Sequence, residues 1–244
     1  MTEFSMKVAA RVVKVSAMFD SSKEYCKGYF CDQQPDFSVE LTAADIAFER
    51  DKSLKTNIAE CVSPRKLSDA QLEITAIQRK IAEGMFAYDT LLFHGSAVAV
   101  DDKAYLFTAK SGTGKSTHTK LWRQLFGNRA LMINDDKPFL RILPDGVLVC
   151  GSPWNGKHKL GNNVMVPLKA ICILERGEEN SISRVSAEEA VPMLLQQSNR
   201  PTKAPLVAKY MELLDALAGS VEFYRLQCNT APDAAEVAYH AMRD

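Results

Sequence analysis

The stretch of sequence that decides the fold is Ala109-Lys110-Ser111-Gly112-Thr113-Gly114-Lys115-Ser116-Thr117. It follows an apolar run typical of a strand and precedes a run typical of a helix. Its pattern is that of a phosphate-binding loop, G-x-x-x-x-G-K-[ST]. Ala109 stands where the first glycine belongs, a position that needs a small residue more than a positive φ. The alternative interpretation is a turn rich in glycine and serine that only connects a strand to a helix.

Physical chemistry gives each residue of this loop a task. Gly112 and Gly114 allow backbone conformations that a Cβ would penalise, so successive N–H groups can form a nest for an anion. The next helix directs its free N–H groups at the same point. We expect Lys115 to reach a β- or γ-phosphate and the Ser116 hydroxyl to ligate Mg²⁺. The predicted nucleotide-binding residues are Ser111, Gly112, Thr113, Gly114, Lys115, Ser116 and Thr117.

Composition places few other limits on the chain. Its 244 residues are 46% hydrophobic and 25% charged, which is ordinary for a globular protein. The formal net charge is +0, so no overall positive field attracts nucleic acid or an anionic membrane. We therefore expect neither as a partner.

The N-terminus and the cysteines favour a cytoplasmic location. Residues 1–5 show no secretory pattern, and no apolar run approaches the roughly 20 residues that span a bilayer. The cysteines match no common zinc or redox spacing, so we expect reduced, mostly structural thiols, with Cys150 and Cys172 buried. The six are Cys26, Cys31, Cys61, Cys150, Cys172 and Cys228.

Residues 1–66 differ in character from residues 67–244, and we place a domain boundary between them. Strands are expected over residues 7–15, 25–31 and 37–41, with a short helix over 45–52. This part is either a small β-rich attachment or a set of strands that extends the main sheet.

The rest of the chain alternates strands and helices and predicts an α/β fold with a mixed sheet flanked by helices. A helix is expected from residue 68, and a hairpin of strands 97–100 and 104–108 leads into the phosphate loop. Ligands of such folds lie at the carboxyl ends of strands. The further expected elements are a helix over 117–126, a strand over 130–133, a hairpin of 139–143 with 147–150, a loop over 151–163, a strand over 170–174, helices over 186–197 and 203–218, a strand over 221–226 and a helix over 231–242.

Two adjacent carboxylates follow the strand after the loop. Asp135 and Asp136 would lie near the loop if the two strands are neighbours. Phosphoryl transfer needs a metal to neutralise charge and a base to accept a proton. The pair can divide these tasks, with Asp135 toward the metal, and the sequence leaves open which is the base. The alternative is an exposed turn. His94, before the hairpin, is either catalytic or structural.

A second unusual loop covers residues 152–159. Trp154 is a candidate to stack on a base or substrate, and Lys157 and Lys159 to bind phosphate or an acidic acceptor. The alternative is a solvated loop with an anchoring tryptophan. Arg200 is a further candidate to stabilise charge. His118 and His240 are expected on helix surfaces, and Trp122 in packing.

In this order, His94-Gly95, a hairpin, residues 111–116 and Asp135-Asp136 resemble the catalytic domain of HPr kinase/phosphorylase. That family shares its fold with the phosphoenolpyruvate carboxykinases. The resemblance covers residues 90 to 175. It implies a carboxykinase-type kinase core, ATP and Mg²⁺ as cofactors and assembly into homo-oligomers. It also implies a catalytic role for His94, for Lys115 and for the aspartate pair.

The family's later motif, a metal-ligating glutamate followed by Arg-Gly, is not found where the resemblance leads us to expect it, and Cys150-Gly151-Ser152-Pro153-Trp154 stands there instead. The expected function is therefore a Mg²⁺-dependent kinase that transfers a phosphoryl group from ATP to another hydroxyl, on a peptide, a protein or a small molecule. The alternatives are a nucleotide-binding regulator or weak NTPase without an acceptor, and a phosphate-binding scaffold without activity. GTP or pyrophosphate as donor stays open.

Overall fold

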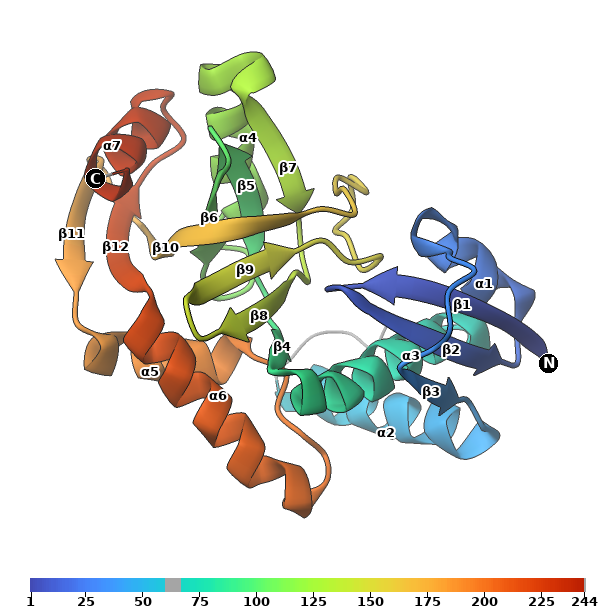
Figure 1. Ribbon diagram of the computed structural model, residues 1–244. Coiled ribbons are helices and arrows are strands. Elements are labelled where there is room, and N and C mark those ends of the chain that lie inside the picture. The colour runs from blue at the N-terminus through green and yellow to red at the C-terminus, as the bar shows by residue number, and fades with distance from the viewer. Residues whose placement is uncertain (60–66, 244) are drawn as a thin grey trace. The chain divides into compact units, whose positions relative to one another are not determined.

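The computed structural model describes residues 1–59 and 67–243 (Figure 1). The chain divides into two compact units, Met1–Gly84 and Met85–Asp244. This division falls later than the boundary expected after residue 66, so the helix that begins after Ser68 goes with the first unit. Cys61 lies outside the described residues.

The first unit has a sheet of its own, in the order β1-β2-β3, and does not extend the main sheet. Strands β1 and β2 are antiparallel, and β3 is parallel to β2. Three helices accompany the sheet, so this unit is less β-rich than expected. Its elements are β1 (Thr2–Val8), β2 (Arg11–Ala17), α1 (Asp20–Cys26), η1 (Lys27–Tyr29), β3 (Phe37–Glu40), α2 (Ala43–Ala59) and α3 (Asp69–Met85).

Two sequence predictions in this unit are wrong. The single strand expected over residues 7–15 is a hairpin, because Ala9 and Ala10 turn the chain with φ values of 47° and 59°. Such turns usually contain Asn or Gly, so the two alanines gave no signal. The strand expected over residues 25–31 is the end of α1 and the turn η1. The strand near residues 37–41 and the helix around residues 45–52 are confirmed.

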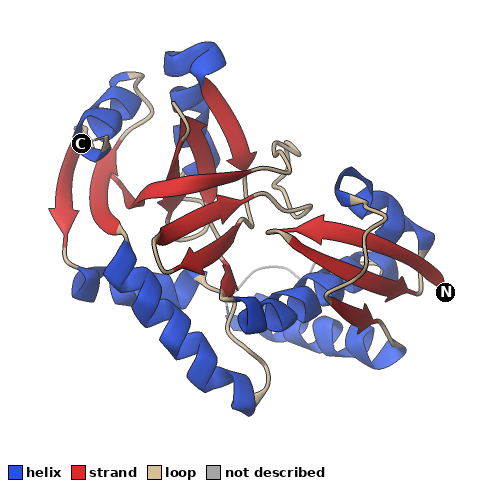
Figure 2. Cartoon of the chain, viewed as in Figure 1, coloured by secondary structure: helices blue, strands red, loops and turns tan. Residues whose placement is uncertain are grey.

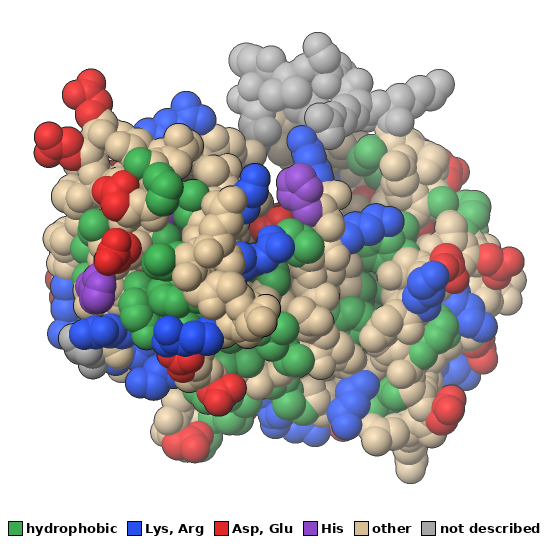
Figure 3. Space-filling model, turned by 90° about the horizontal axis from the view of Figure 1, so that it is seen from above, with side chains coloured by type: hydrophobic (Ala, Val, Ile, Leu, Met, Phe, Trp, Pro, Cys, Tyr) green, Lys and Arg blue, Asp and Glu red, His purple; other side chains and the backbone are tan. Residues whose placement is uncertain are grey.

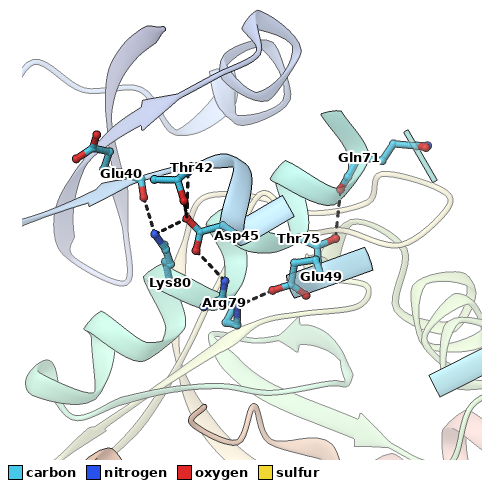
Figure 4. A network of polar contacts seen from close by, with 8 residues as sticks. All are labelled: Glu40, Thr42, Asp45, Glu49, Gln71, Thr75, Arg79 and Lys80. Carbon is cyan, nitrogen blue, oxygen red and sulfur yellow. Dashed lines mark hydrogen bonds and ion pairs between the residues drawn. The ribbon is translucent and has the colours of Figure 1, made fainter. Parts of the chain in front are cut away.

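Buried charges of α3 hold the first unit together. The Glu73 carboxylate is fully buried and accepts hydrogen bonds from the backbone N–H groups of Met18 and Phe19, at 2.6 and 3.1 Å, and from the Ser22 hydroxyl. Arg79 donates to Glu49 and Asp45 of α2, as Figure 4 shows. Buried charges are tolerated when they are paired in this way.

The second unit is built around a curled mixed sheet, in the order β4-β8-β9-β10-β6-β5-β7, with β12 on β10 and β11 on β12 (Figure 2). Most expected elements are confirmed; β4 and β11 were not predicted. The elements are η2 (Phe86–Tyr88), β4 (Thr90–Leu92), β5 (Ser96–Val100), β6 (Lys103–Thr108), α4 (Lys115–Phe126), η3 (Gly127–Arg129), β7 (Ala130–Asn134), β8 (Phe139–Leu143), β9 (Gly146–Cys150), β10 (Met165–Arg176), β11 (Ser181–Val185), α5 (Ala187–Gln197), η4 (Ala204–Leu206), α6 (Val207–Ser220), β12 (Glu222–Cys228) and α7 (Asp233–Met242).

Strand directions decide which residues meet at one edge of this sheet. β5 lies between β6 and β7 and is antiparallel to both, so β6 and β7 run in the same direction. β10 is parallel to β6. The carboxyl ends of β6, β7 and β10 therefore share an edge with the start of β5, although β6 and β7 are not direct neighbours.

Both faces of the sheet are covered, which explains the continuous apolar runs of its strands. Ala97 and Leu106 belong to a core with side chains of α5 and α6. Val98 and Phe107 belong to a second core with side chains of α4 and α7. The alternation between the two cores follows the two-residue period of a strand.

Trp122 of α4 is fully buried in the second core, as expected, but His118 is not on the helix surface. His118 is only 3% exposed and lies edge-on against Phe107. Its Nε2 accepts a 3.0 Å hydrogen bond from Nε1 of Trp122. Burial lowers the pKa of His118 to about 4. The side of α4 that carries His118 thus faces the core, although the sequence predicted that it faces solvent.

The cysteines of residues 1–59 and 67–243 are free, as expected. Cys150 and Cys172 are buried, and burial raises the pKa of Cys150 to about 12. Such thiols carry little thiolate and are structural. None of the helices described for this chain is both long and apolar enough to cross a membrane.

Candidate phosphoryl-transfer site

The phosphate-loop sequence connects β6 to α4, as the pattern requires. Gly112 and Gly114 have φ values of 77° and 123°, which disfavour any side chain. The Lys110 carbonyl accepts hydrogen bonds from the N–H and the hydroxyl of Thr113, at 3.3 and 2.9 Å. The loop is therefore an ordered turn that leaves Ser111, Ser116 and Thr117 exposed at the start of the helix.

Lys115, the first residue of α4, folds back over this turn. Its Nζ donates a 3.2 Å hydrogen bond to the carbonyl of Ala109. Partial burial lowers the pKa of Lys115, while the charges of Asp136 and Asp135 act in the opposite direction. The ammonium group thus lies within electrostatic range of both carboxylates.

Asp135 follows β7 and is buried. Its Oδ1 accepts a 2.8 Å hydrogen bond from the hydroxyl of Ser96, at the start of β5. The Ser96 oxygen lies 2.9 Å from Oγ1 of Thr119 on α4. Because the Ser96 proton is directed at Asp135, Thr119 donates to Ser96. This chain of two hydroxyls fixes Asp135 against the helix that carries the phosphate loop.

Asp136 is more exposed and pairs with His94, whose Nε2 lies 3.3 Å from its Oδ1. Burial and nearby lysines, Lys137 and Lys115, lower the pKa of His94 against the opposing effect of Asp136. Burial raises the pKa of Asp136, but His94 and the lysines outweigh it, so the pKa is lowered. Near neutral pH, the pair is a neutral imidazole beside a carboxylate.

The turn that presents the two aspartates is shaped by Asn134. Its Oδ1 accepts from the backbone N–H groups of Asp136 and Lys137, at 2.8 and 2.7 Å. Its Nδ2 donates to the carbonyl and hydroxyl oxygens of Ser152, at 3.0 and 3.1 Å. A side chain that accepts from the N–H groups two and three positions later stabilises a tight turn, so Asn134 sets the direction in which Asp135 and Asp136 leave the strand.

Of the three candidates for substrate contact, Trp154 is not positioned as expected. Trp154 is 4% exposed and packs against Phe139, with 6.3 Å between ring centroids. It anchors the loop and offers no stacking surface. Arg200 is exposed and follows Ser198, which forms an isolated β-bridge with Phe93. Lys157 is exposed next to Gly156, where a Cβ would lie 3.3 Å from Oδ2 of Asp135.

Sequence reasoning missed four residues that shape this site, Ser96, Thr119, Asn134 and Arg176. The tripeptide Glu175-Arg176-Gly177 does occur in the chain, at the end of β10, later than the region where we expected the family's motif. Nη2 of Arg176 donates a 2.7 Å hydrogen bond to the carbonyl of Gly112. Of the four missed residues, only Arg176 could have been found from the sequence, because it stands in this tripeptide.

The residues described do not contain three or more His, Cys, Asp or Glu side chains grouped to hold a metal ion. Mg²⁺ usually takes one or two protein ligands and completes its shell with water and phosphate oxygens. The Ser116 hydroxyl and the Asp135 carboxylate are oxygen donors of that kind. The donor set therefore fits Mg²⁺ bound together with a nucleotide better than a resident metal cage.

On the face of the molecule shown in Figure 3, both basic and acidic side chains are present.

Comparisons with known proteins add little to the assignment of a function. No protein-family model matches the chain, and no curated protein matches it. Among solved structures, it is similar to the HPr(Ser) kinase/phosphatase from Coxiella burnetii, with a TM-score of 0.38 and 12% sequence identity. The alignment covers 62% of this chain and 95% of that one. At this level, the likeness decides neither the activity nor the substrate of the present chain.

Proposed function

We propose that this chain is a Mg²⁺-dependent phosphotransferase that moves the γ-phosphoryl group of ATP to a hydroxyl acceptor. One observation carries the proposal. A phosphate loop with its lysine, Lys115, and two carboxylates, Asp135 and Asp136, lie at the same edge of the sheet within electrostatic range of one another. Phosphoryl transfer needs this combination of cation, metal ligand and base.

The two carboxylates have different surroundings, which suggests different tasks. Asp135 is buried and held by Ser96 on the side of α4, so we assign it with Ser116 to Mg²⁺. Bound there, Mg²⁺ would neutralise charge on the phosphate oxygens. Asp136 is more accessible and pairs with His94, so we assign it as the base.

In the proposed reaction, Asp136 accepts the proton of the acceptor hydroxyl. The acceptor oxygen forms a bond to the γ-phosphorus, and the bond from that phosphorus to the β–γ bridging oxygen breaks. ADP leaves with the electron pair. Lys115 and the N–H groups of the loop stabilise charge on the phosphate oxygens. His94 keeps Asp136 ionised and oriented.

The hairpin of β5 and β6 before the loop supports a core of the carboxykinase type, because it brings His94 to the start of β5. In a plain βαβ arrangement, the phosphate loop would follow the first strand without such a hairpin. We propose this architecture for the second unit.

The deciding experiment compares Lys115→Met with Lys120→Met, an exposed lysine on the same helix. Calorimetry with Mg²⁺ and AMP-PNP measures nucleotide binding, and radiolabelled ATP measures transfer. We expect nucleotide binding to be lost in Lys115→Met and kept in Lys120→Met. If wild type binds no nucleotide, the proposal is wrong. Release of inorganic phosphate that no acceptor suppresses would favour the alternative of an NTPase.

Asp135→Asn and Asp136→Asn separate the two assignments. We expect Asp136→Asn to bind AMP-PNP with Mg²⁺ normally but to lose transfer. We expect Asp135→Asn to lose the effect of Mg²⁺ on nucleotide binding. The opposite pattern would exchange the two roles.

A further inference from the structure

A short basic turn lies next to the proposed site and has no task in the reaction described above. It consists of Gly156, Lys157, His158 and Lys159, and the Lys159 N–H closes it with a 2.9 Å hydrogen bond to the Gly156 carbonyl. Lys159 has a φ of 50°, a conformation that costs free energy for a side chain with a Cβ. The residues between Gly156 and Lys159 are exposed. The basic turn is therefore a defined conformation with its side chains at the surface.

The loop on both sides of the basic turn is attached to β7. On one side, the Asn155 side-chain amide donates a 3.2 Å hydrogen bond to the Ser152 carbonyl. Ser152 in turn accepts hydrogen bonds from the side-chain amide of Asn134. On the other, Asn162 donates through its backbone N–H to Ile133 at 3.0 Å and through its side chain to Met132 at 2.8 Å. These hydrogen bonds hold the turn at a fixed place relative to β7, the strand that precedes Asp135.

The two sides of the loop also pack against each other. A Cβ on Gly161 would lie 2.1 Å from Oδ1 of Asn155, a distance that no side chain can occupy. Gly161 also forms an isolated β-bridge with Asn134. The base of the loop is thus closed around the Asn155 side chain, and the turn projects from a packed base.

The place of the turn relative to Asp135 points to the acceptor side of the site. Oδ1 of Asp135 is bonded to Ser96, and through it to α4, which carries the phosphate loop. Oδ2 faces Gly156, where a Cβ would come within 3.3 Å. The basic turn and α4 therefore approach different oxygens of one carboxylate. If the nucleotide phosphates lie on the α4 side, the turn lies on the side that an acceptor must occupy.

The charge of the turn is not balanced from within. Residues 151–163 include no Asp or Glu. Among residues 1–59 and 67–243, neither lysine of the turn forms an ion pair with a carboxylate, whereas Lys14, Lys80 and Lys209 do. Two ammonium groups without partners, at a fixed position beside a reaction site, attract an anion.

We propose that the basic turn binds an anionic group of the acceptor. The acceptor is then a hydroxyl compound that carries a carboxylate or phosphate close to the reacting hydroxyl. This inference rests on the proposed function, because only a transfer reaction distinguishes a donor from an acceptor. The anion site itself depends only on the residues of the turn. The other source of an anion at this place is the donor nucleotide.

The test uses inorganic phosphate as the probe, titrated by calorimetry into the full chain saturated with Mg²⁺ and AMP-PNP. Lys157→Gln with Lys159→Gln removes the charges of the turn. Lys103→Gln with Lys203→Gln is the matched control, because it removes the same charge at exposed positions elsewhere in the second unit. We expect wild type and control to bind phosphate equally and the turn variant to bind it about tenfold more weakly. Affinity for AMP-PNP should be the same in all three.

Three outcomes would overturn the inference. Equal phosphate affinity in all three proteins, or no phosphate binding above a non-specific background, would mean an adventitious ion only. Weaker AMP-PNP binding in the turn variant would assign the turn to the donor nucleotide. If wild type binds no AMP-PNP, the proposed function fails. The same phosphate titration in a Lys115→Met background then still tests the turn.

A second variant tests the position of the turn without changing its charge. Gly156→Ala adds a Cβ 3.3 Å from the backbone oxygen and from Oδ2 of Asp135, so the turn and Asp135 have to separate by a few tenths of an ångström. We expect weaker phosphate binding with both lysines still present. Circular dichroism and thermal unfolding would verify that the fold is kept. Unchanged phosphate affinity in a folded Gly156→Ala protein would show that the approach to Asp135 is irrelevant to the anion.

Discussion

The hydroxyl of Ser96 donates a 2.8 Å hydrogen bond to Oδ1 of Asp135, across 39 positions of sequence. Ser96 is the first residue of β5, and Asp135 follows the last residue of β7. Because β5 separates β7 from the strand before the phosphate loop, this bond joins the aspartate to the rest of the site. Thr119 of α4 completes the connection.

On the proposed function, Ser96→Ala should reduce phosphoryl transfer more than it reduces nucleotide binding. A hydrogen bond to a charged group is worth about 1.5–3 kcal/mol, which corresponds to a roughly 10- to 100-fold lower rate if it acts in the transition state. Single-turnover kinetics with labelled ATP would measure the effect. Ser186→Ala is the control, since it removes the capping box of α5 and should cost about 1 kcal/mol of stability without changing the rate. An equal loss of rate in both variants would contradict the prediction.

His118 should make the protein less stable in acid. Its pKa is lowered to about 4 by burial, whereas an unfolded histidine titrates near 6.5. The unfolded state therefore binds a proton first, so the free energy of unfolding falls as the pH decreases from about 6.5 toward 4. At 1.36 kcal/mol per pKa unit, the loss from this residue is roughly 3 kcal/mol.

Denaturant unfolding at several pH values would measure that loss. His118→Gln should flatten the dependence between pH 6.5 and 4, because glutamine does not titrate. His240→Gln, at an exposed position of α7, should leave it unchanged. A steep dependence that persists in His118→Gln would assign it to other groups, of which His94 acts in the same direction.

Gly95→Ala should destabilise the second unit and disturb His94 beside it. A Cβ at Gly95 would lie 2.8 Å from Cδ1 of Leu106 and 3.0 Å from the carbonyl oxygen of Phe107. Overpacking of this kind costs about 1–3 kcal/mol. Gly219→Ala is the matched control, because a Cβ there meets nothing within 4 Å and should improve the α6 helix by up to about 1 kcal/mol. Thermal unfolding should show opposite shifts, and shifts in the same direction would refute the packing argument.

Glu73→Gln should destabilise the first unit. The carboxylate accepts three hydrogen bonds in a buried setting, and a neutral amide has one acceptor oxygen where the carboxylate has two. We expect a loss of about 2 kcal/mol in the free energy of unfolding. Glu24→Gln, in an exposed pair with Lys27, should change it by less than about 1 kcal/mol. Equal effects of the two substitutions would show that the Glu73 bonds are not important.

Some of the structure was predictable because it depends on residues close in sequence. The turn between β6 and α4 follows from Gly112 and Gly114, whose positive φ values the sequence pattern predicts. The Pro144-Asp145-Gly146 turn between β8 and β9 follows from turn chemistry alone. The N-terminus of α3 follows from Ser68 and Gln71, because the side chain of each accepts a hydrogen bond from the backbone N–H group of the other.

Other features depend on which segments meet in space. The prediction that His118 lies on the helix surface was wrong, because the burial of a polar ring depends on packing against Phe107 of another element, which the sequence of α4 alone does not show. The sequence left open whether Trp154 contacts a substrate or anchors its loop, because the answer depends on its packing against Phe139 of β8. The hairpin at Ala9 and Ala10 contains no turn residue, so its stability comes from the pairing of β1 with β2 and of β2 with β3.

The sequence by itself determined that a phosphate is expected at residues 109–117 and that two aspartates follow the next strand in the chain, since local backbone preferences fix both. Only the tertiary structure decided that β5 lies between those two strands and that Ser96 fixes Asp135. It also decided that Asp136 pairs with His94 and that a basic turn approaches Asp135 from its other side. The physical reason is that strand order and direction arise from long-range pairing and burial, which no short pattern in the sequence records.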